Sequence, residues 1–118
     1  MTPRLNPFAA APAPMQAWLD FSQGVARGGL EESLMDLVKI RASQINGCAF
    51  CIHMHTAEAR KRGETEERLY LLNAWRDSPL FSARERAALA WTEALTRVAD
   101  SHAPDDAYQA VEAAFDEA

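Results

Sequence analysis

The chain has 118 residues, enough for one domain with a single hydrophobic core. Its formal net charge is −5, so it lacks the basic surface that neutralises phosphates, and we expect no nucleic-acid partner. No apolar run approaches the roughly 20 residues that cross a bilayer, and the N-terminal segment has no apolar stretch long enough for a secretion signal. We therefore expect no membrane partner and a cytoplasmic location.

The predicted elements are all helices. Residues 1–13 are rich in proline and are expected to form an extended N-terminal arm. Asn46-Gly47 should end the second helix, because glycine readily adopts a left-handed stop, and Ser82 with Glu85 forms a capping box for the fifth. No stretch alternates with period two, so we expect no strands. The predicted helices cover roughly residues 14–27, 30–45, 48–63 and 64–75, followed by a long helix that begins behind Ser82 and includes Leu89, Trp91 and Leu95, and by a last helix over residues 104–115.

The two cysteines of the chain, Cys48 and Cys51, lie three residues apart at the predicted start of the third helix. At about 100° per residue, His55 and both cysteines share one narrow face over two turns. Two thiols at this spacing can close a disulfide without a large backbone movement. A helix N-terminus and a nearby imidazole both favour the reactive thiolate. Cys48 is nearer the helix end and Cys51 nearer His55, so this reasoning leaves the attacking thiol open.

Other interpretations of the same segment remain open. The two cysteines and His55 could be three ligands of a zinc site, with His53 or a carboxylate as the fourth. Alternatively, the cysteines could be inert apolar residues. We expect His53 to be a solvated surface side chain and His102 to be a cation near a helix C-terminus.

Asp36 lies on the helix before the cysteines, in an otherwise apolar stretch. One interpretation is a solvated position on an amphipathic helix. The other is a partly buried carboxylate that orients and polarises His55, as the third member of a nucleophile–base–orienter set. The spacing alone does not separate these two possibilities.

The run from Leu34 to His55, with an acidic residue, eleven further residues and then Cys-x-x-Cys-x-x-x-His, closely resembles the core motif of the alkylhydroperoxidase AhpD-like proteins. These belong to the carboxymuconolactone decarboxylase superfamily. The segments Leu-Leu-Asn-Ala-Trp-Arg-Asp-Ser and Phe-Ser-Ala-Arg-Glu-Arg-Ala-Ala-Leu-Ala-Trp-Thr-Glu-Ala also look like that family. The resemblance implies an AhpD-like domain over residues 14–118 with an all-α fold, an antiparallel helical bundle that assembles as a homo-oligomer, a trimer or hexamer.

The resemblance also implies an activity, the reduction of a hydroperoxide substrate through a dithiol–disulfide cycle in antioxidant defence. Cys51 would attack the peroxide, Cys48 would resolve the sulfenic acid, and His55 and Asp36 would form a proton relay. No bound cofactor or metal is expected. The electron donor would be an external dithiol, such as a lipoamide-like group or a lipoylated protein. The alternative is a non-catalytic oligomeric redox-sensing or metal-binding module.

Three features of this sequence depart from the family pattern. The acidic relay residue is usually Glu, and the shorter Asp36 could contact His55 through a water. The characterised peroxidase has a histidine where this chain has Phe50. Family members usually continue into a further helix, so we expect either a shortened chain or an assembly that buries the exposed surface of tryptophans. The candidate tryptophans are Trp18, Trp75 and Trp91.

Overall fold

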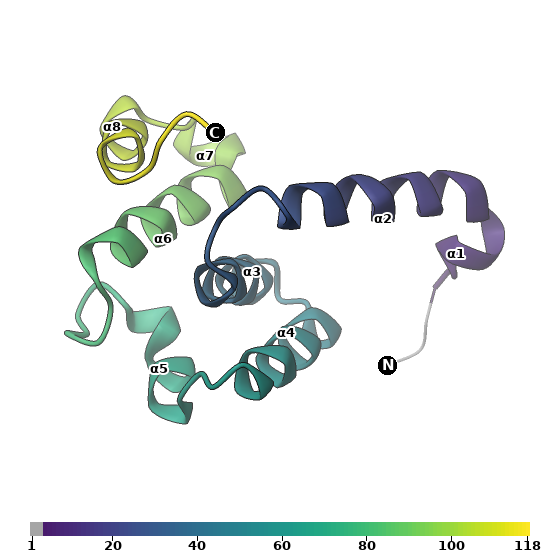
Figure 1. The fold of residues 1–118 in the computed structure, drawn as a ribbon, viewed down its shortest axis with the longest axis horizontal. Helices are drawn as coiled ribbons and strands as arrows, with labels where there is room; N and C mark the ends of the chain where they lie inside the picture. Colours follow the sequence, from purple (N-terminus) through teal and green to yellow (C-terminus); the bar gives the residue numbers. More distant parts are fainter. Residues whose placement is uncertain (1–3) are drawn as a thin grey trace. The chain divides into compact units, whose positions relative to one another are not determined.

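The computed structural model describes residues 4–118, and these residues form helices, turns and irregular segments without a strand. They belong to two compact units, Met1–Leu30 and Glu31–Ala118. The predicted all-α fold is therefore confirmed for the described part of the chain (Figure 1). The first unit contains α1 (Pro7–Ala10) and α2 (Pro12–Ala26). The second contains α3 (Glu32–Asn46), α4 (Ala49–Lys61), α5 (Glu66–Leu71), the 3₁₀ turn η1 (Leu72–Ala74), α6 (Ala83–Thr96), α7 (Val98–Ser101) and α8 (Asp105–Ala114).

The extended conformation expected for residues 1–13 is wrong for most of the segment that the structure describes. Residues 7–10 form α1 and residues 12–13 begin α2, while residues 1–3 lie outside the described residues. Pro7 and Pro12 instead occupy the first positions of α1 and α2, where a missing N–H costs no helical hydrogen bond. Asn6 caps α1, since its side-chain oxygen accepts hydrogen bonds from the N–H groups of Phe8 and Ala9 at 3.1 and 3.4 Å.

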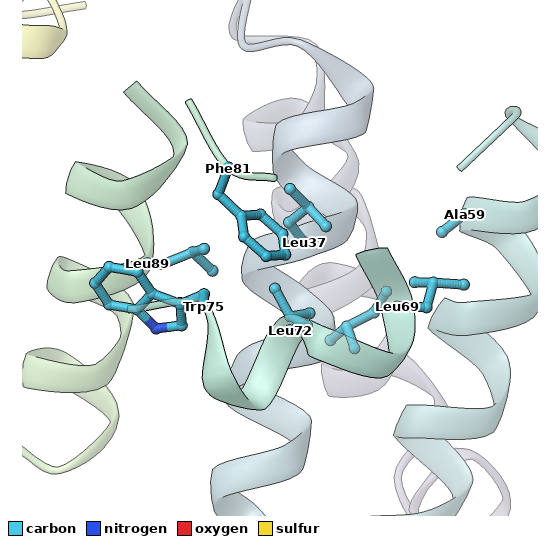
Figure 2. Close-up of a cluster of buried hydrophobic side chains, with 8 residues drawn as sticks. Leu37, Ala59, Leu69, Leu72, Trp75, Phe81 and Leu89 are labelled. Atoms are coloured by element: carbon cyan, nitrogen blue, oxygen red, sulfur yellow. The ribbon is translucent and has the colours of Figure 1, made fainter. Parts of the chain in front are cut away.

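The second unit is organised around α3, which packs against both α4 and α6 (Figure 1). The α5–η1 segment contributes the third side of the hydrophobic core, and α8 packs on α6. Figure 2 shows the buried side chains of this core converging from these elements. The core residues are Leu37, Ile40, Ala59, Leu69, Leu72, Trp75, Phe81 and Leu89. This core fixes the face of α3 that carries Asp36 against α4, and so determines what surrounds the cysteines.

A polar network joins α3, η1 and α6 beside the core. Oε1 of Glu93 accepts hydrogen bonds from Nε of Arg41 at 3.0 Å and from the indole N–H of Trp75 at 2.9 Å. Its other oxygen, Oε2, accepts one from Arg76 at 3.1 Å. Trp75 is therefore buried within its own chain, and the expectation that it supplies exposed surface for an assembly is wrong.

Most predicted helix boundaries agree with the structure to within two or three residues. The segment 64–75 is the exception, because it divides into the short α5 and the 3₁₀ turn η1 rather than forming one helix. The predicted capping box is confirmed, with Ser82 and Glu85 each bonded to the backbone N–H of the other. Within residues 4–118, no helix is both long and apolar enough to cross a membrane.

Candidate active site

A tight turn between α3 and α4 places the two cysteines. Gly47 has a left-handed backbone with φ of 64°, which ends α3 as predicted. The N–H groups of Gly47 and Cys48 bond back to the carbonyls of Gln44 and Ser43 at 3.2 and 3.1 Å. The chain consequently enters α4 directly, with Cys48 as its N-cap residue.

The two cysteines form a disulfide across the first turn of α4. Their Cα atoms are 5.3 Å apart, within the range that disulfides ordinarily span. Both residues are half-buried, so the bond is accessible to small molecules at the protein surface. The prediction that these two cysteines can form a disulfide is confirmed, and the structure represents the oxidised state of the pair.

Cys48 also uses its sulfur to cap the helix. The backbone N–H of Cys51 donates a hydrogen bond to the Cys48 Sγ at 3.2 Å. Unpaired N–H groups and the positive end of the helix dipole both stabilise a negative charge at this position. When the disulfide is reduced, the same amide can therefore stabilise a thiolate on Cys48.

His55 lies two turns further along α4, and its side chain is only 18% exposed. Its Nδ1 lies 3.3 Å from Oε2 of Glu58, one turn on. Among the residues that the structure describes, no hydrogen bond joins His55 to either sulfur or to Asp36. Glu58 was not predicted as a site residue, although it follows His55 by three positions and therefore shares its helix face.

Asp36 is buried, as one of its two interpretations required, with 3% of its surface exposed. Its partner, however, is Arg62, which donates a hydrogen bond from Nη1 to Oδ1 at 2.6 Å. The direct ion pair of Asp36 is therefore with Arg62 and not with His55. The longer reach of an arginine from the end of α4 explains this outcome, and it leaves Oδ2 of Asp36 buried without a hydrogen-bond partner among the described residues.

The charge of Arg62 is stabilised mainly by Asp36. The hydrogen bond and the charge of Asp36 raise the pKa of this arginine, and Glu32 and Glu58 add smaller attractions in the same direction. Glu32 lies one turn before Asp36 on α3, with its Oε2 3.5 Å from Nε of Arg62. Arg62 thus connects the end of α4 to the first two turns of α3.

The remaining predicted positions lie at the periphery. Phe50, which replaces the histidine of the characterised peroxidase, is 62% exposed beside the disulfide. His53 is exposed, as expected for a solvated side chain. His102 is the C-cap of α7, close to a helix C-terminus as predicted. Within residues 4–118 no group of three or more His, Cys, Asp or Glu side chains is arranged to hold a metal ion, and both cysteines are committed to the disulfide.

Sequence comparison assigns residues 12–94 to the carboxymuconolactone decarboxylase family. The chain is also 40% identical, over 99% of its length and 80% of the relative's, to the uncharacterized protein YdfG of Bacillus subtilis (strain 168). A second relative, the uncharacterized protein YnjA of Escherichia coli (strain K12), is 35% identical over 58% of this chain and 37% of its own. The chain belongs to the carboxymuconolactone decarboxylase family.

Comparison with solved structures places the chain within an AhpD-like group of that family. A crystal structure from Agrobacterium tumefaciens superposes with a TM-score of 0.93 and 40% identity, covering 98% of this chain and 80% of the other. That protein is described as one of unknown function with a suggested identity as the antioxidant defence protein AhpD. The AhpD-like helical fold predicted from the motif is therefore confirmed.

Proposed function

We propose that this protein is a thiol-dependent peroxidase that reduces hydroperoxides through a Cys48–Cys51 dithiol–disulfide cycle. The observation that carries the proposal is the accessible disulfide across the first turn of α4. An antioxidant role is in keeping with the family and with the description of the Agrobacterium tumefaciens neighbour. The titratable groups His55 and Asp36 on α4 and α3 provide candidates for proton transfer.

The oxidative half of the cycle consumes one hydroperoxide. The Cys51 thiolate attacks a peroxide oxygen, so that an S–O bond forms while the O–O bond breaks, and the departing alkoxide takes up a proton to leave as an alcohol. Cys51 is then a sulfenic acid. The Cys48 thiolate attacks the Cys51 sulfur, an S–S bond replaces the S–O bond, and the released hydroxide takes up a proton to leave as water.

The reductive half of the cycle requires an external dithiol. One thiolate of the donor attacks the Cys48–Cys51 disulfide to form a mixed disulfide, and the second donor thiol completes the exchange. Cys48 and Cys51 recover their protons, and the donor leaves as a disulfide. The proposed donor is a lipoamide-like dithiol or a lipoylated protein, because two linked thiols complete the exchange without a further partner.

The proposed assembly is a homo-oligomer, a trimer or hexamer. It is supported by the first unit, where α2 exposes Trp18, Phe21 and Val25 at positions that share one helix face. Such a face is costly to leave in water, and closed symmetric assemblies are the common way to bury it. Light scattering coupled to size-exclusion chromatography measures the oligomer directly.

The test is sustained consumption of tert-butyl hydroperoxide with dihydrolipoamide as the reductant. The wild-type protein should turn over many equivalents, whereas Cys51→Ser should fall to the rate without protein. Cys48→Ser should form a sulfenic acid that a dimedone probe can label, because no thiol resolves it. Full activity in Cys51→Ser would overturn the proposal. Consumption of one peroxide per disulfide, with no further turnover, would indicate a redox sensor instead.

A further inference from the structure

The position of Glu58 next to His55 suits it to hold the imidazole ring in place. An imidazole that bonds to nothing exchanges its proton between two nitrogens and rotates about χ2, so it is a poor proton acceptor at any fixed place. Nδ1 of His55 lies 3.3 Å from Oε2 of Glu58, and the two side chains are three residues apart on α4. Glu58 is 43% exposed, so its carboxylate keeps access to water while it holds the ring.

The chemistry of the two groups determines where the proton lies. An ionised carboxylate can only accept hydrogen bonds, so the nitrogen facing Glu58 must be the one that bears hydrogen. In neutral His55 this leaves Nε2 unprotonated and able to accept a proton. Glu58 therefore favours the tautomer with hydrogen on Nδ1, in which Nε2 has a lone pair available to accept a proton.

Asp36 does not contact this pair directly and is linked to it through Arg62. Arg62 occupies Oδ1 of Asp36, and it follows Glu58 by four residues, with the acid on the N-terminal side where such pairs are most favourable. The attraction of Glu58 is one of the influences that raise the pKa of Arg62. The order along the site is thus Asp36, Arg62, Glu58 and His55, rather than Asp36 directly on His55.

We propose that Glu58 is a positioning residue that fixes the tautomer and orientation of His55 for proton transfer at the cysteines. Its consequence for catalysis rests on the proposed peroxidase function. In that cycle, Nε2 of His55 takes the proton of the Cys51 thiol before attack and returns it to the departing alkoxide. Glu58 acts only as the hydrogen-bond acceptor of the ring and takes no part in the proton transfer itself.

The decisive measurement is the tautomer of His55, read from its ¹⁵N chemical shifts in the reduced full-length protein at a pH where the ring is neutral. His53 and His102 are replaced by Gln, so that His55 gives the only imidazole signals. The background protein and Glu58→Gln should hold the hydrogen on Nδ1, since the amide oxygen of Gln also accepts a hydrogen bond. Glu58→Leu should shift the proton toward Nε2. An unchanged tautomer in Glu58→Leu would overturn the inference.

Turnover provides the second readout. In proteins that keep His53 and His102, Glu58→Leu should lower kcat about tenfold, a fraction of the 10²–10⁴ that a positioned acid–base group supplies, with little change in KM. Glu58→Gln should recover most of this loss. Glu67→Gln, which removes an exposed carboxylate from α5, is the matched control and should match the wild type. A loss of kcat that is equal in Glu58→Leu and Glu58→Gln would contradict the positioning role.

The two proposals fail in distinguishable ways. If the wild-type protein does not turn over peroxide, the peroxidase function fails, while the tautomer measurement still decides whether Glu58 positions His55. If the wild type turns over and the tautomer does not depend on Glu58, the peroxidase function stands and the role of Glu58 is wrong. Thermal unfolding followed by circular dichroism verifies that each variant remains folded.

Discussion

The half-buried carboxylate of Glu93 and the buried carboxylate of Asp36 differ in how fully their oxygens are hydrogen-bonded. Glu93 on α6 has both oxygens occupied, by Arg41 and Trp75 on one and Arg76 on the other. Asp36 on α3 has a single partner, Arg62, and its second oxygen is buried without one among the described residues. A fully satisfied buried network stabilises and specifies a core, whereas a half-satisfied one calls for a functional explanation.

The contrast between these carboxylates divides the helical bundle into two regions. One supports the stability of the fold, and the other contains the residues proposed for catalysis. The Glu93 network lies beside the hydrophobic core, between α3, η1 and α6. The Asp36 cluster lies on the other side of α3, against the helix that carries the cysteines. Variants in the first region should therefore affect stability without altering chemistry, and variants in the second should do the reverse.

The largest expected change in stability is that of Glu93→Ala. Removing this carboxylate leaves Nε of the buried Arg41 and the indole N–H of the buried Trp75 without their acceptor, which should reduce the free energy of unfolding by about 3 kcal/mol. Urea denaturation followed by circular dichroism measures the loss. The disulfide should still form in this variant, as titration of free thiols would verify. A loss below about 1 kcal/mol would mean that the network is not the structural support inferred here.

Asp36→Asn should have a small effect on stability and a large effect on peroxide turnover. Its cost in stability should be about 1 kcal/mol, because Arg62 is 41% exposed, can turn toward water and retains Glu32. Peroxide turnover should nevertheless fall about tenfold or more, since the proposed proton relay loses a carboxylate. The measurement pairs a urea titration with the dihydrolipoamide-dependent assay. If Asp36→Asn kept normal turnover and lost as much stability as Glu93→Ala, the proposed difference between the two regions would be wrong.

Acid should weaken the contribution of Glu93 to stability. Burial acts to raise the pKa of Glu93, but the hydrogen bonds from Trp75, Arg76 and Arg41 outweigh it, so the pKa lies below the ordinary value of 4.5. A group with a lowered folded-state pKa stabilises the protein above its unfolded-state pKa, and this contribution is lost as pH falls through the folded value. Urea midpoints measured from pH 6 downward should therefore decline more steeply in the wild type than in Glu93→Gln below about pH 4.5. Parallel declines would contradict this assignment.

The smallest effect is expected outside both regions. Arg60 and Glu66 form a bidentate ion pair between the end of α4 and the start of α5, and both side chains are nearly half exposed. Exposed pairs gain little, because water and salt screen the attraction and two long side chains lose freedom. Glu66→Gln should leave the urea midpoint unchanged within error, at low salt and in 0.5 M NaCl alike. A clear loss at low salt would show that the pair acts as part of a larger network.

Features that depend on local sequence were predictable. The stop at Gly47 and the capping box at Ser82 follow from backbone and side-chain chemistry within a few residues, and both are confirmed. The disulfide follows from helix geometry in the same way. The proline content of residues 1–13 predicts an extended arm and not the helices found there, although Pro7 and Pro12, which follow Asn6 and Ala11, suit a first helical turn.

The partners of the charged side chains were not predictable from spacing. Asp36 and His55 lie in the segments that the motif highlights, yet the choice between His55 and Arg62 depends on side-chain reach across two packed helices. That choice is a tertiary property, which residue spacing does not encode. Glu58, in contrast, could have been found, because an acidic residue three positions after a histidine on a helix is a neighbour by geometry alone.

The cross-link at the start of α4 has a consequence for how the molecule tolerates repeated oxidation. It closes a loop that begins at Cys48 and ends only three residues later, at Cys51. In the chain-entropy description, a loop this short restrains the unfolded chain by only about 2 kcal/mol, against nearly 5 for a loop of about 100 residues. The hydrophobic core contains neither sulfur. Opening and closing this bond therefore changes one helical turn, and the rest of the bundle can serve as an invariant frame through many cycles.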